Sequence, residues 1–200
     1  MKLILASNNA HKLVELQALF ATLPVELVSQ KALGIADAEE PFPTFVENAL
    51  AKARHAAGRG GAAAIADDSG LCVAALDGAP GVRSARYAAL SGVASGDAQN
   101  NRLLLERMQG VTDRRARFVS VLVALRSPAD PLPLIAIGDW PGELLSTPRG
   151  AGGFGYDPLL YIPALGCSVG ELDPATKNAH SHRAVAVARM LAAMRAHWFG

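Results

Sequence analysis

The sequence has few cysteines, few aromatic side chains, no excess of charge of either sign and no long apolar run. Cys72 and Cys167 lie far apart and neither belongs to a C-x-x-C pair, which argues against a disulfide framework or a zinc knuckle. The 19 basic and 18 acidic residues leave a net charge of +1, so no global field recruits nucleic acid or an anionic membrane. A basic binding site must therefore be local.

Only 6% of the residues are aromatic although 50% are hydrophobic, so the core is expected to consist mainly of small aliphatic side chains. A chain of 200 residues with this composition buries a core without disulfides or metals. We expect a single domain over residues 1–200, either as one compact body or as two small lobes. The apolar run at 3–6 is too short for a signal peptide or a membrane span, which favours a cytoplasmic protein.

Periodicity and turn signals predict a β-α-β order at the start of the chain and hairpins in the middle. This order indicates an α/β fold with a mixed sheet. Strands are expected at 3–6, 25–28, 62–66, 118–125 and 134–137. Helices are expected at 13–20, from 45 to a stop at Gly58, at 97–108, and from about 181 to the C-terminus.

Several local signals refine this outline. Thr44 and Glu47 have the spacing of a capping box, in which each side chain satisfies a free backbone donor of the other residue. Asp97 is placed to cap the helix that follows it. The strand at 62–66 is expected to end at Asp67-Asp68-Ser69-Gly70, after which residues 71–74 turn back beside it. Residues 77–95, rich in Gly, Pro and Ser, are expected to form an ordered loop.

The segment Ser7-Asn8-Asn9-Ala10-His11-Lys12 lies where a strand leads into a helix. Short polar side chains there leave backbone N–H groups accessible, and the helix N-terminus adds positive potential, so the segment can bind a phosphate with Lys12 as a point charge. An ordinary helix cap followed by a solvated lysine is the alternative. The segment is not a Walker loop, because G-x-x-x-x-G-K-[ST] occurs nowhere in the chain.

Asp67 and Asp68 are adjacent carboxylates after an apolar strand, and their repulsion requires compensation. Mg²⁺ provides it, since this ion takes one or two carboxylates together with phosphate oxygens of a substrate. Glu39-Glu40 offers a second acidic pair before the helix that carries Lys52. The alternative is a turn in which an Asp side chain caps backbone amides.

Residues 150–155 satisfy G-x-G-x-x-G, but the dinucleotide fingerprint also needs a helix immediately after it. Pro158 disfavours helical backbone at Asp157, so we reject the dinucleotide interpretation. A tight loop that approaches a ligand closely remains, with Phe154 either as a stacking surface or as a core residue.

Lys177, His182 and Arg183 fall within seven positions near a helix start. Cations there oppose the helix dipole and call for an anionic partner, although solvated charge is the alternative. His180-x-His182 without a third ligand is weak evidence for a metal. No G-x-S-x-G motif surrounds Ser69, so nucleophilic catalysis has little support.

Together these segments resemble the inosine triphosphate pyrophosphatase family over nearly the whole chain. The motifs that carry the resemblance are Ser7-x-Asn9-x-x-Lys12, Glu40, Thr44-Phe45-x-Glu47-Asn48-Ala49 with Lys52, Ala66-Asp67-Asp68-Ser69-Gly70-Leu71, Gly78-Ala79-Pro80-Gly81, Ser84-Ala85-Arg86-Tyr87, Gly152-Gly153-Phe154-Gly155-Tyr156-Asp157-Pro158, Lys177 and Ser181-His182-Arg183. Two small departures are Ser at position 7, where Thr is frequent, and Ala184, where Gly is common.

The resemblance implies an elongated mixed sheet flanked by helices, two lobes around a central nucleotide-binding cleft, and a homodimer. It implies Mg²⁺-dependent hydrolysis of deaminated purine triphosphates, such as ITP, dITP and XTP, to the monophosphate and pyrophosphate. Asp68, or Asp67, would be the catalytic carboxylate, and Glu40 would share the metal with Asp68. The residues that would grip the triphosphate are Ser7, Asn8, Asn9, Ala10, His11, Lys12, Lys52, Ser69 and Lys177. Those that would surround the base are Phe154, Gly155, Tyr156, Asp157, His182 and Arg183.

Two other functions remain open at this point. One is a pyrophosphatase of the same fold that acts on pyrimidine or modified triphosphates. The other is a nucleotide- or RNA-binding module without catalysis, against which the paired acids argue, because an anion-binding surface avoids them unless a metal is present.

Overall fold

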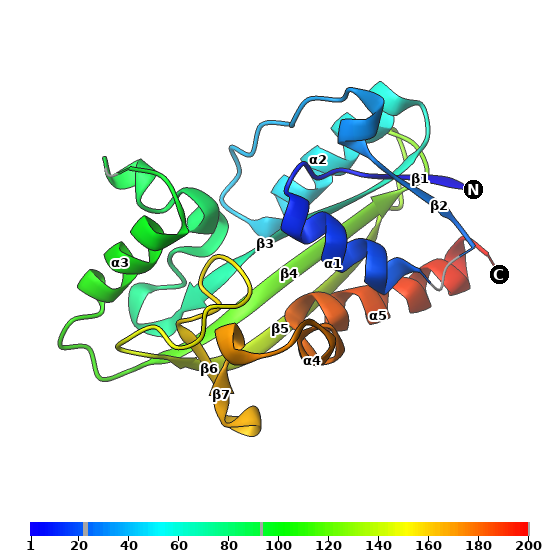
Figure 1. Ribbon diagram of the computed structural model, residues 1–200. Helices are drawn as coiled ribbons and strands as arrows, with labels where there is room; N and C mark the ends of the chain where they lie inside the picture. The colour runs from blue at the N-terminus through cyan, green and yellow to red at the C-terminus, as the bar shows by residue number, and fades with distance from the viewer. Residues whose placement is uncertain (22–23, 93, 200) are drawn as a thin grey trace. The chain divides into compact units, whose positions relative to one another are not determined.

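The computed structural model describes residues 1–21, 24–92 and 94–199. Its helices and strands follow one another as shown in Figure 1: β1 (Lys2–Leu5), α1 (Ala10–Phe20), β2 (Glu26–Ser29), α2 (Phe45–Gly60), β3 (Ala63–Val73), α3 (Asp97–Arg107), β4 (Arg115–Leu125), β5 (Leu134–Leu144), β6 (Leu160–Ile162), β7 (Cys167–Ser168), α4 (Pro174–His180) and α5 (His182–His197). Among the described residues, no helix combines the length and the apolar character that crossing a bilayer requires.

The strands form one mixed sheet in the order β2-β1-β3-β4-β5-β6-β7. β1 pairs in parallel with β2 and with β3, whereas β6 pairs antiparallel with β5 and with β7. Parallel neighbours need a crossover connection, which α1 provides between β1 and β2. The prediction of an α/β fold with a mixed sheet flanked by helices is confirmed.

The chain divides into two compact units. The first unit comprises Met1–Asp68, Ser120–Gly138 and His182–Gly200, and the second comprises Ser69–Val119 and Asp139–Ser181. The long strands β3, β4 and β5 each contribute residues to both units, because the boundaries after residues 68, 119 and 138 fall inside them.

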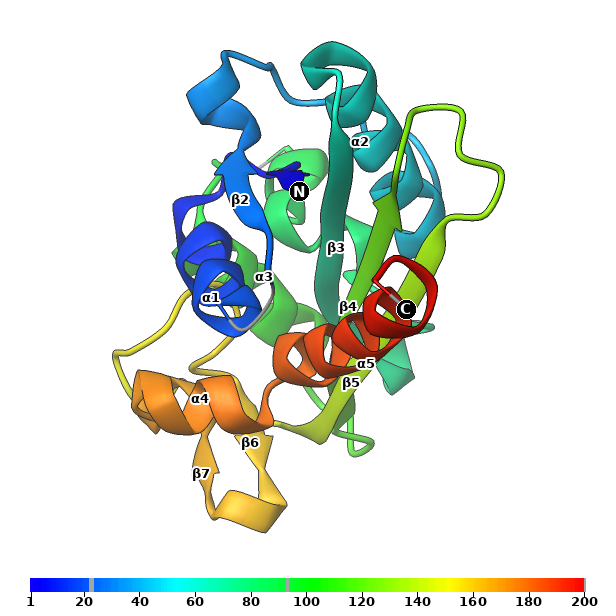
Figure 2. The same cartoon turned by 90° about the vertical axis from the view of Figure 1, so that its right-hand side faces the viewer.

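The core of the first unit lies between the sheet and the helices α1 and α5. Leu3 and Leu5 of β1 belong to this core, whereas Ile4 points to the opposite face, as strand alternation requires. On that face Ile4 packs against Gly60 of α2, so closely that a Cβ added at Gly60 would lie 2.2 Å from the Cδ1 atom of Ile4. Figure 2 shows α1 and α2 on different sides of β3. Each face of these strands is therefore covered by its own helix or helices.

The core of the second unit holds more of the aromatic residues. Tyr87, Phe118, Trp140 and Tyr156 are buried there among leucines and valines. The hydroxyl of Tyr156 donates a hydrogen bond of 2.9 Å to the carbonyl of Ser84, so its polar end is satisfied inside the core. The expectation of a small aliphatic core therefore describes the first unit better than the second.

The predicted turn at Asp67–Gly70 is wrong. β3 runs without interruption from Ala63 to Val73, and residues 71–74 do not turn back beside residues 62–66. A turn would have kept the two carboxylates in water. Lysines from the helices neutralise them instead, so the strand continues through them.

Helix ends also differ from the prediction. α2 ends at Gly60 rather than Gly58, and Gly61 follows in the left-handed conformation, with φ of 61°, that glycine adopts without strain. Thr44 caps α2 by accepting from the backbone N–H of Glu47, but the Glu47 carboxylate accepts from the Thr44 hydroxyl rather than from its backbone. Asp97 is the first residue of α3 and Gly96 is its N-cap, so Asp97 does not cap the helix.

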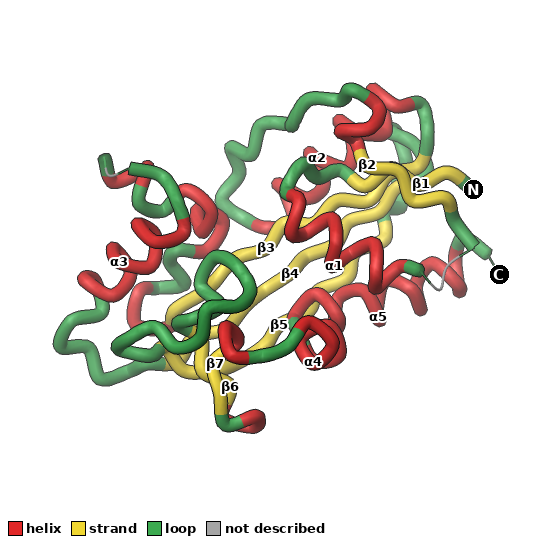
Figure 3. The backbone as a smooth tube through the Cα atoms, in the orientation of Figure 1, coloured by secondary structure: helices red, strands yellow, loops and turns green. Residues whose placement is uncertain are grey.

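The middle and C-terminal parts of the chain contain elements that the pattern did not reveal. β4 and β5 extend beyond their predicted bounds, and the short strands β6 and β7 were not predicted. Residues 77–95 include short 3₁₀ turns at 81–86 and 89–91, and Val93 lies outside the described residues. Residues 145–159 form a loop without helix or strand, as Figure 3 shows, so the prediction that no helix follows the glycines is confirmed.

A substitution at Gly138 tests the packing of α5 on β5. A Cβ at this position would lie 2.1 Å from the carbonyl oxygen of His182 and 2.5 Å from the backbone nitrogen of Ala186, so backbone must move. We expect Gly138→Ala to lower the free energy of unfolding by about 1–3 kcal/mol, the usual scale for overpacking. Urea denaturation followed by circular dichroism measures it.

Gly58→Ala is the matched control, because a Cβ there meets only Pro128 at an ordinary 3.8 Å. Alanine is favoured over glycine inside a helix by about 1 kcal/mol, so this variant should be as stable as the wild type or more stable. Equal unfolding energies for Gly138→Ala and the wild type would contradict the packing described here.

Candidate active site

Two adjacent acids of β3 organise a cluster of buried charges in the first unit. Successive side chains of a strand point to opposite faces. Asp67 therefore faces α1 and α5, where it meets Lys12, and Asp68 faces α2, where it meets Lys52. Each carboxylate is neutralised by a lysine from the helix on its own side of the sheet.

Asp68 shares the ammonium group of Lys52 with Glu40. Lys52 Nζ lies 2.8 Å from Asp68 Oδ1 and 2.7 Å from Glu40 Oε1, so both acids are within reach of one cation. The Asp68 side chain is only 7% exposed, and its Oδ2 atom is buried without a hydrogen-bond partner in the part of the chain that the structure describes. Burial raises the pKa of Asp68, and the Lys52 ammonium offsets only part of that rise.

Asp67 has the opposite electrostatic environment. Its Oδ2 lies 2.8 Å from Lys12 Nζ and 3.8 Å from Arg183 Nε, and its Oδ1 accepts a hydrogen bond of 2.6 Å from Ser120. Burial acts to raise the pKa of Asp67, but the charges of Lys12 and Arg183 outweigh it and hold that pKa well below the usual range. Burial in turn lowers the pKa of Lys12. Asp67 is thus a permanently ionised anchor.

The geometry around Asp68 suits a hard divalent cation. Across residues 1–21, 24–92 and 94–199, no three His, Cys, Asp or Glu side chains gather closely enough to ligate one metal ion by themselves. Mg²⁺ does not need such a cage, because it binds through one or two carboxylates and completes its shell with water and substrate phosphates. The unpartnered Oδ2 of Asp68 and the nearby carboxylate of Glu40 meet that requirement.

The segment 7–12 forms the start of α1, as the cap interpretation proposed. The Asn9 side chain accepts from the backbone N–H of Lys12 at 3.1 Å, and Ser7 Oγ accepts from the N–H of Asn9 at 3.2 Å. Asn8 donates to Asp37 at 2.8 Å, which fixes its side chain. Lys12 is not solvated, however: its side chain is 16% exposed and bound to Asp67.

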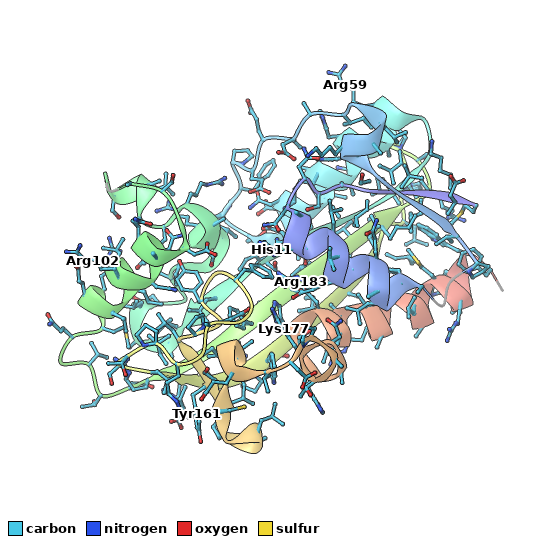
Figure 4. The ribbon with its side chains drawn as sticks, viewed as in Figure 1. His11, Arg59, Arg102, Tyr161, Lys177 and Arg183 are labelled. Carbon is cyan, nitrogen blue, oxygen red and sulfur yellow. The ribbon has the colours of Figure 1, made fainter. Side chains whose placement is uncertain are left out.

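Ala10 and His11 lie in the first turn of α1 and are exposed, so neither side chain is buried in the core. Figure 4 shows His11 at this end of the helix. The N-terminal turn of a helix can bind an anion through its backbone N–H groups.

A second cluster lies in the second unit, around the glycine-rich loop of residues 152–157, which we call the base loop. Lys177 Nζ lies 2.8 Å from Asp157 Oδ2 and 4.6 Å from the centroid of the Phe154 ring. The same Asp157 oxygen accepts from the backbone N–H of Phe154 at 2.8 Å. At Gly153, where φ is 75°, a Cβ would come within 2.0 Å of that oxygen, so only glycine fits.

Of the remaining predicted site residues, Arg183 belongs to the first cluster. Arg183 is 4% exposed and donates to Glu15 Oε2 at 2.7 Å, and His182 is 3% exposed. Solvated charge is therefore excluded for them, and the anionic partners of Arg183 are the carboxylates of Glu15 and Asp67. Ser69 follows Asp68 directly in β3, and Tyr156 uses its hydroxyl within the core.

Sequence reasoning missed Glu15 and Ser120 as members of the first cluster. Each carried a detectable signal. Glu15 lies three positions after Lys12 on α1, which places the two side chains on one face of the helix. Ser120 is a lone hydroxyl within the apolar strand β4, and its burial requires a hydrogen-bond partner.

Comparison with known proteins identifies the family of the chain. Residues 3–193 match the model of the Ham1 family. A relative from Methylibium petroleiphilum, named dITP/XTP pyrophosphatase, is 64% identical over 99% of both chains. A solved HAM1 protein from Coxiella burnetii has a TM-score of 0.91 and 43% identity over 98% of this chain and 99% of its own. The Ham1 protein of Staphylococcus aureus has a TM-score of 0.86 and 34% identity, with the same coverage.

The family model spans nearly the full length of the chain, and the relatives are similar to it in sequence and fold over almost that whole length. The resemblance found in the motifs is thereby confirmed, and the chain belongs to the Ham1 family.

Proposed function

We propose that this protein is a nucleoside-triphosphate pyrophosphatase that hydrolyses deaminated purine nucleotides, such as ITP, dITP and XTP, to the monophosphate and pyrophosphate. The observation that carries the proposal is the pair of carboxylates, Glu40 and Asp68, joined through the Lys52 ammonium while one Asp68 oxygen stays buried and unpartnered. The names of the curated relatives, dITP/XTP pyrophosphatase, support the same reaction and substrate class.

In this proposal Glu40 and Asp68 would hold a magnesium ion, which would neutralise phosphate charge. The unpartnered Asp68 oxygen fits such an ion, and the described residues form no closed cage, so the ion would also take substrate oxygens. Lys52 is already positioned by the same two acids, so it can bind a phosphate oxygen next to them.

Asp68 is the proposed general base. It orients a water molecule and accepts its proton while the water oxygen bonds to the α-phosphorus and the bond to the bridging oxygen breaks, releasing pyrophosphate. A carboxylate whose pKa is raised by burial is a stronger base than one in water. Asp67 does not suit this role, because Lys12, Arg183 and Ser120 occupy both of its oxygens.

The other site residues divide between the two ends of the nucleotide. Segment 7–12, Lys52 and Ser69 are assigned to the triphosphate, where the α1 N-terminus and the ammonium groups stabilise negative charge on the leaving group. The base loop is assigned to the purine, together with His182 and Arg183. Lys177, which the resemblance assigned to the triphosphate, is reassigned to the purine because it contacts Asp157 and the Phe154 ring.

Base selection follows from hydrogen-bond polarity. A 6-keto purine presents an acceptor at O6 and a donor at N1, whereas adenine presents the reverse. The Lys177 ammonium is a donor and the Asp157 carboxylate is an acceptor, and the two lie 2.8 Å apart. A site with both groups matches the 6-keto edge, and mismatched buried polar groups can discriminate by about 10⁴-fold.

The resemblance further supports a homodimer that acts on the cytoplasmic nucleotide pool. Light scattering on the purified protein gives its molar mass in solution and tests the dimer.

A panel of triphosphates tests the reaction and the metal. We expect ITP, dITP and XTP to be cleaved to monophosphate and pyrophosphate, and turnover to vanish when EDTA removes magnesium and to return when magnesium is restored. ATP, dUTP and dTTP serve as comparison substrates. Faster turnover of dUTP or dTTP would favour the pyrimidine alternative, and no pyrophosphate from any nucleotide would sink the proposal.

Replacing Asp68 by Asn tests its role as the base. The amide keeps the shape of the side chain but cannot accept the proton, so kcat for dITP should fall by about 10²–10⁴-fold. Nucleotide binding, measured by isothermal titration calorimetry, should persist. Near-normal turnover in this variant would refute the assignment.

Replacing Asp67 by Asn tests whether Asp67 has a structural role, in contrast to the catalytic role proposed for Asp68. Loss of this carboxylate leaves the buried Lys12 without its counter-ion, and breaking a buried pair costs about 3–5 kcal/mol. We expect that loss in the free energy of unfolding measured with urea. Asp113→Asn is the matched control, because its ion pair with Arg115 is exposed to solvent and such pairs contribute little to stability. Similar losses in both variants would contradict the buried anchor.

A further inference from the structure

Helix α3 forms hydrogen bonds with both the backbone N–H and the backbone carbonyl of Gly155 in the base loop. Asp97 Oδ2 accepts a hydrogen bond of 2.6 Å from the backbone N–H of Gly155. Asn101 Nδ2 donates a hydrogen bond of 3.0 Å to the carbonyl of the same Gly155. All three residues belong to the second unit. One glycine of the base loop is thus bound on both sides by a helix more than fifty positions earlier in the chain.

The spacing on α3 makes this double contact possible. Asp97 and Asn101 are four positions apart, so their side chains lie one above the other on the same face of the helix. Asp97 is the first residue of α3, where a carboxylate is favoured by the helix dipole. Its hydrogen bond nevertheless leaves the helix and goes to the loop.

The Asn101 side chain is not explained by packing. Its Oδ1 atom is buried and has no hydrogen-bond partner among the described residues, which costs stability. A leucine would fill a similar volume without that cost. The bond from Nδ2 to Gly155 is therefore the contribution that sets asparagine apart at this position.

The loop itself needs external support. Gly153 and Gly155 have φ of 75° and 63°, a conformation that glycine does not prefer over its other states. Inside the loop, Asp157 fixes the N–H of Phe154. The next residue, Gly155, is fixed by α3. The backbone on both sides of the Phe154 ring is thus held by carboxylates.

We propose that Asp97 and Asn101 are positioning residues that set the selectivity for the 6-keto base by fixing Gly155. This inference rests on the proposed function, since it assigns the base loop to the purine. Discrimination between bases needs polar groups held in place before the ligand arrives. Releasing Gly155 loosens the Phe154 ring and the groups around it, which weakens binding and selectivity but leaves the water activation at Asp68 intact.

Two nearly isosteric variants each alter one contact: Asp97→Asn weakens its hydrogen bond and Asn101→Leu removes its own. Asp97→Asn keeps an acceptor but loses the charge, and Asn101→Leu keeps the volume but loses the donor. Arg102→Ala is the control on the same helix, because its side chain is 83% exposed, pairs with Glu106 and points outward in Figure 4. Asp130→Asn is the control for an Asp that accepts from backbone N–H groups away from the base loop.

Hydrogen exchange of residues 152–157 in the ligand-free protein is the readout that does not depend on activity. We expect exchange to accelerate about 3- to 10-fold in Asp97→Asn and Asn101→Leu, the scale of losing one charge-assisted or amide hydrogen bond. It should be unchanged in Arg102→Ala and Asp130→Asn. Unchanged exchange in both test variants would overturn the inference even if the enzyme acts as proposed.

Steady-state kinetics supply the second readout. KM for dITP should rise about 3- to 10-fold and the ratio of kcat/KM for dITP over dATP should fall by a similar factor, with kcat within twofold. The free energy of unfolding of Asn101→Leu should be no lower than that of the wild type. A fall in kcat with KM and selectivity unchanged would show a structural role only and would overturn the inference.

Failure of the proposed function gives a different result. A wild-type protein that cleaves no nucleotide would end the functional proposal, whereas the exchange experiment would still report whether α3 holds Gly155. A wild type that cleaves dITP, with variants of unchanged exchange and selectivity, would remove the positioning role alone.

Discussion

The alternation of side chains along one uninterrupted strand is the constraint on which the site depends. Because β3 does not turn at Asp67 and Asp68, the two neighbouring carboxylates point to opposite faces of the sheet. Their mutual repulsion is reduced by this separation, and each meets a different lysine. A single residue of shift in β3 would exchange the two acids and leave Lys12 and Lys52 facing the wrong partners.

This separation gives two identical side chains different chemistry. Asp67, bound by Lys12, Ser120 and Arg183, has a pKa far below the ordinary range and cannot accept a proton under working conditions. Asp68, less compensated, has a pKa raised by burial and keeps an oxygen without a partner. Environments that push apart the pKa values of two neighbouring acids indicate which one transfers protons. The proposal that Asp68 is the base rests on this difference between the two carboxylates.

Much of this site could be predicted from residue types and order, and the failures have physical causes. Asp67 and Asp68 were identified as a compensated pair, but Asp-Asp-Ser-Gly is also the composition of a turn. What distinguishes the strand from the turn is the pairing of the two carboxylates with Lys12 and Lys52 on the covering helices. These lysines are distant in sequence, so the local pattern does not reveal them. Asp97 has the local pattern of a cap, yet it bonds to Gly155. A one-dimensional pattern shows local capping but not a partner in another loop.

The buried network around Asp67 connects parts of the chain that are far apart in sequence. Lys12 and Glu15 come from α1, Asp67 from β3, and Arg183 from α5. Desolvating so many charges is costly, and well-packed apolar side chains of similar volume often give equal or greater stability. Stability alone therefore does not account for the network. Its position accounts for it, because Asp67 lies directly next to Asp68, the proposed general base, in β3. The network fixes two helices to this strand: α1, whose N-terminal turn carries segment 7–12, and α5, which carries Arg183.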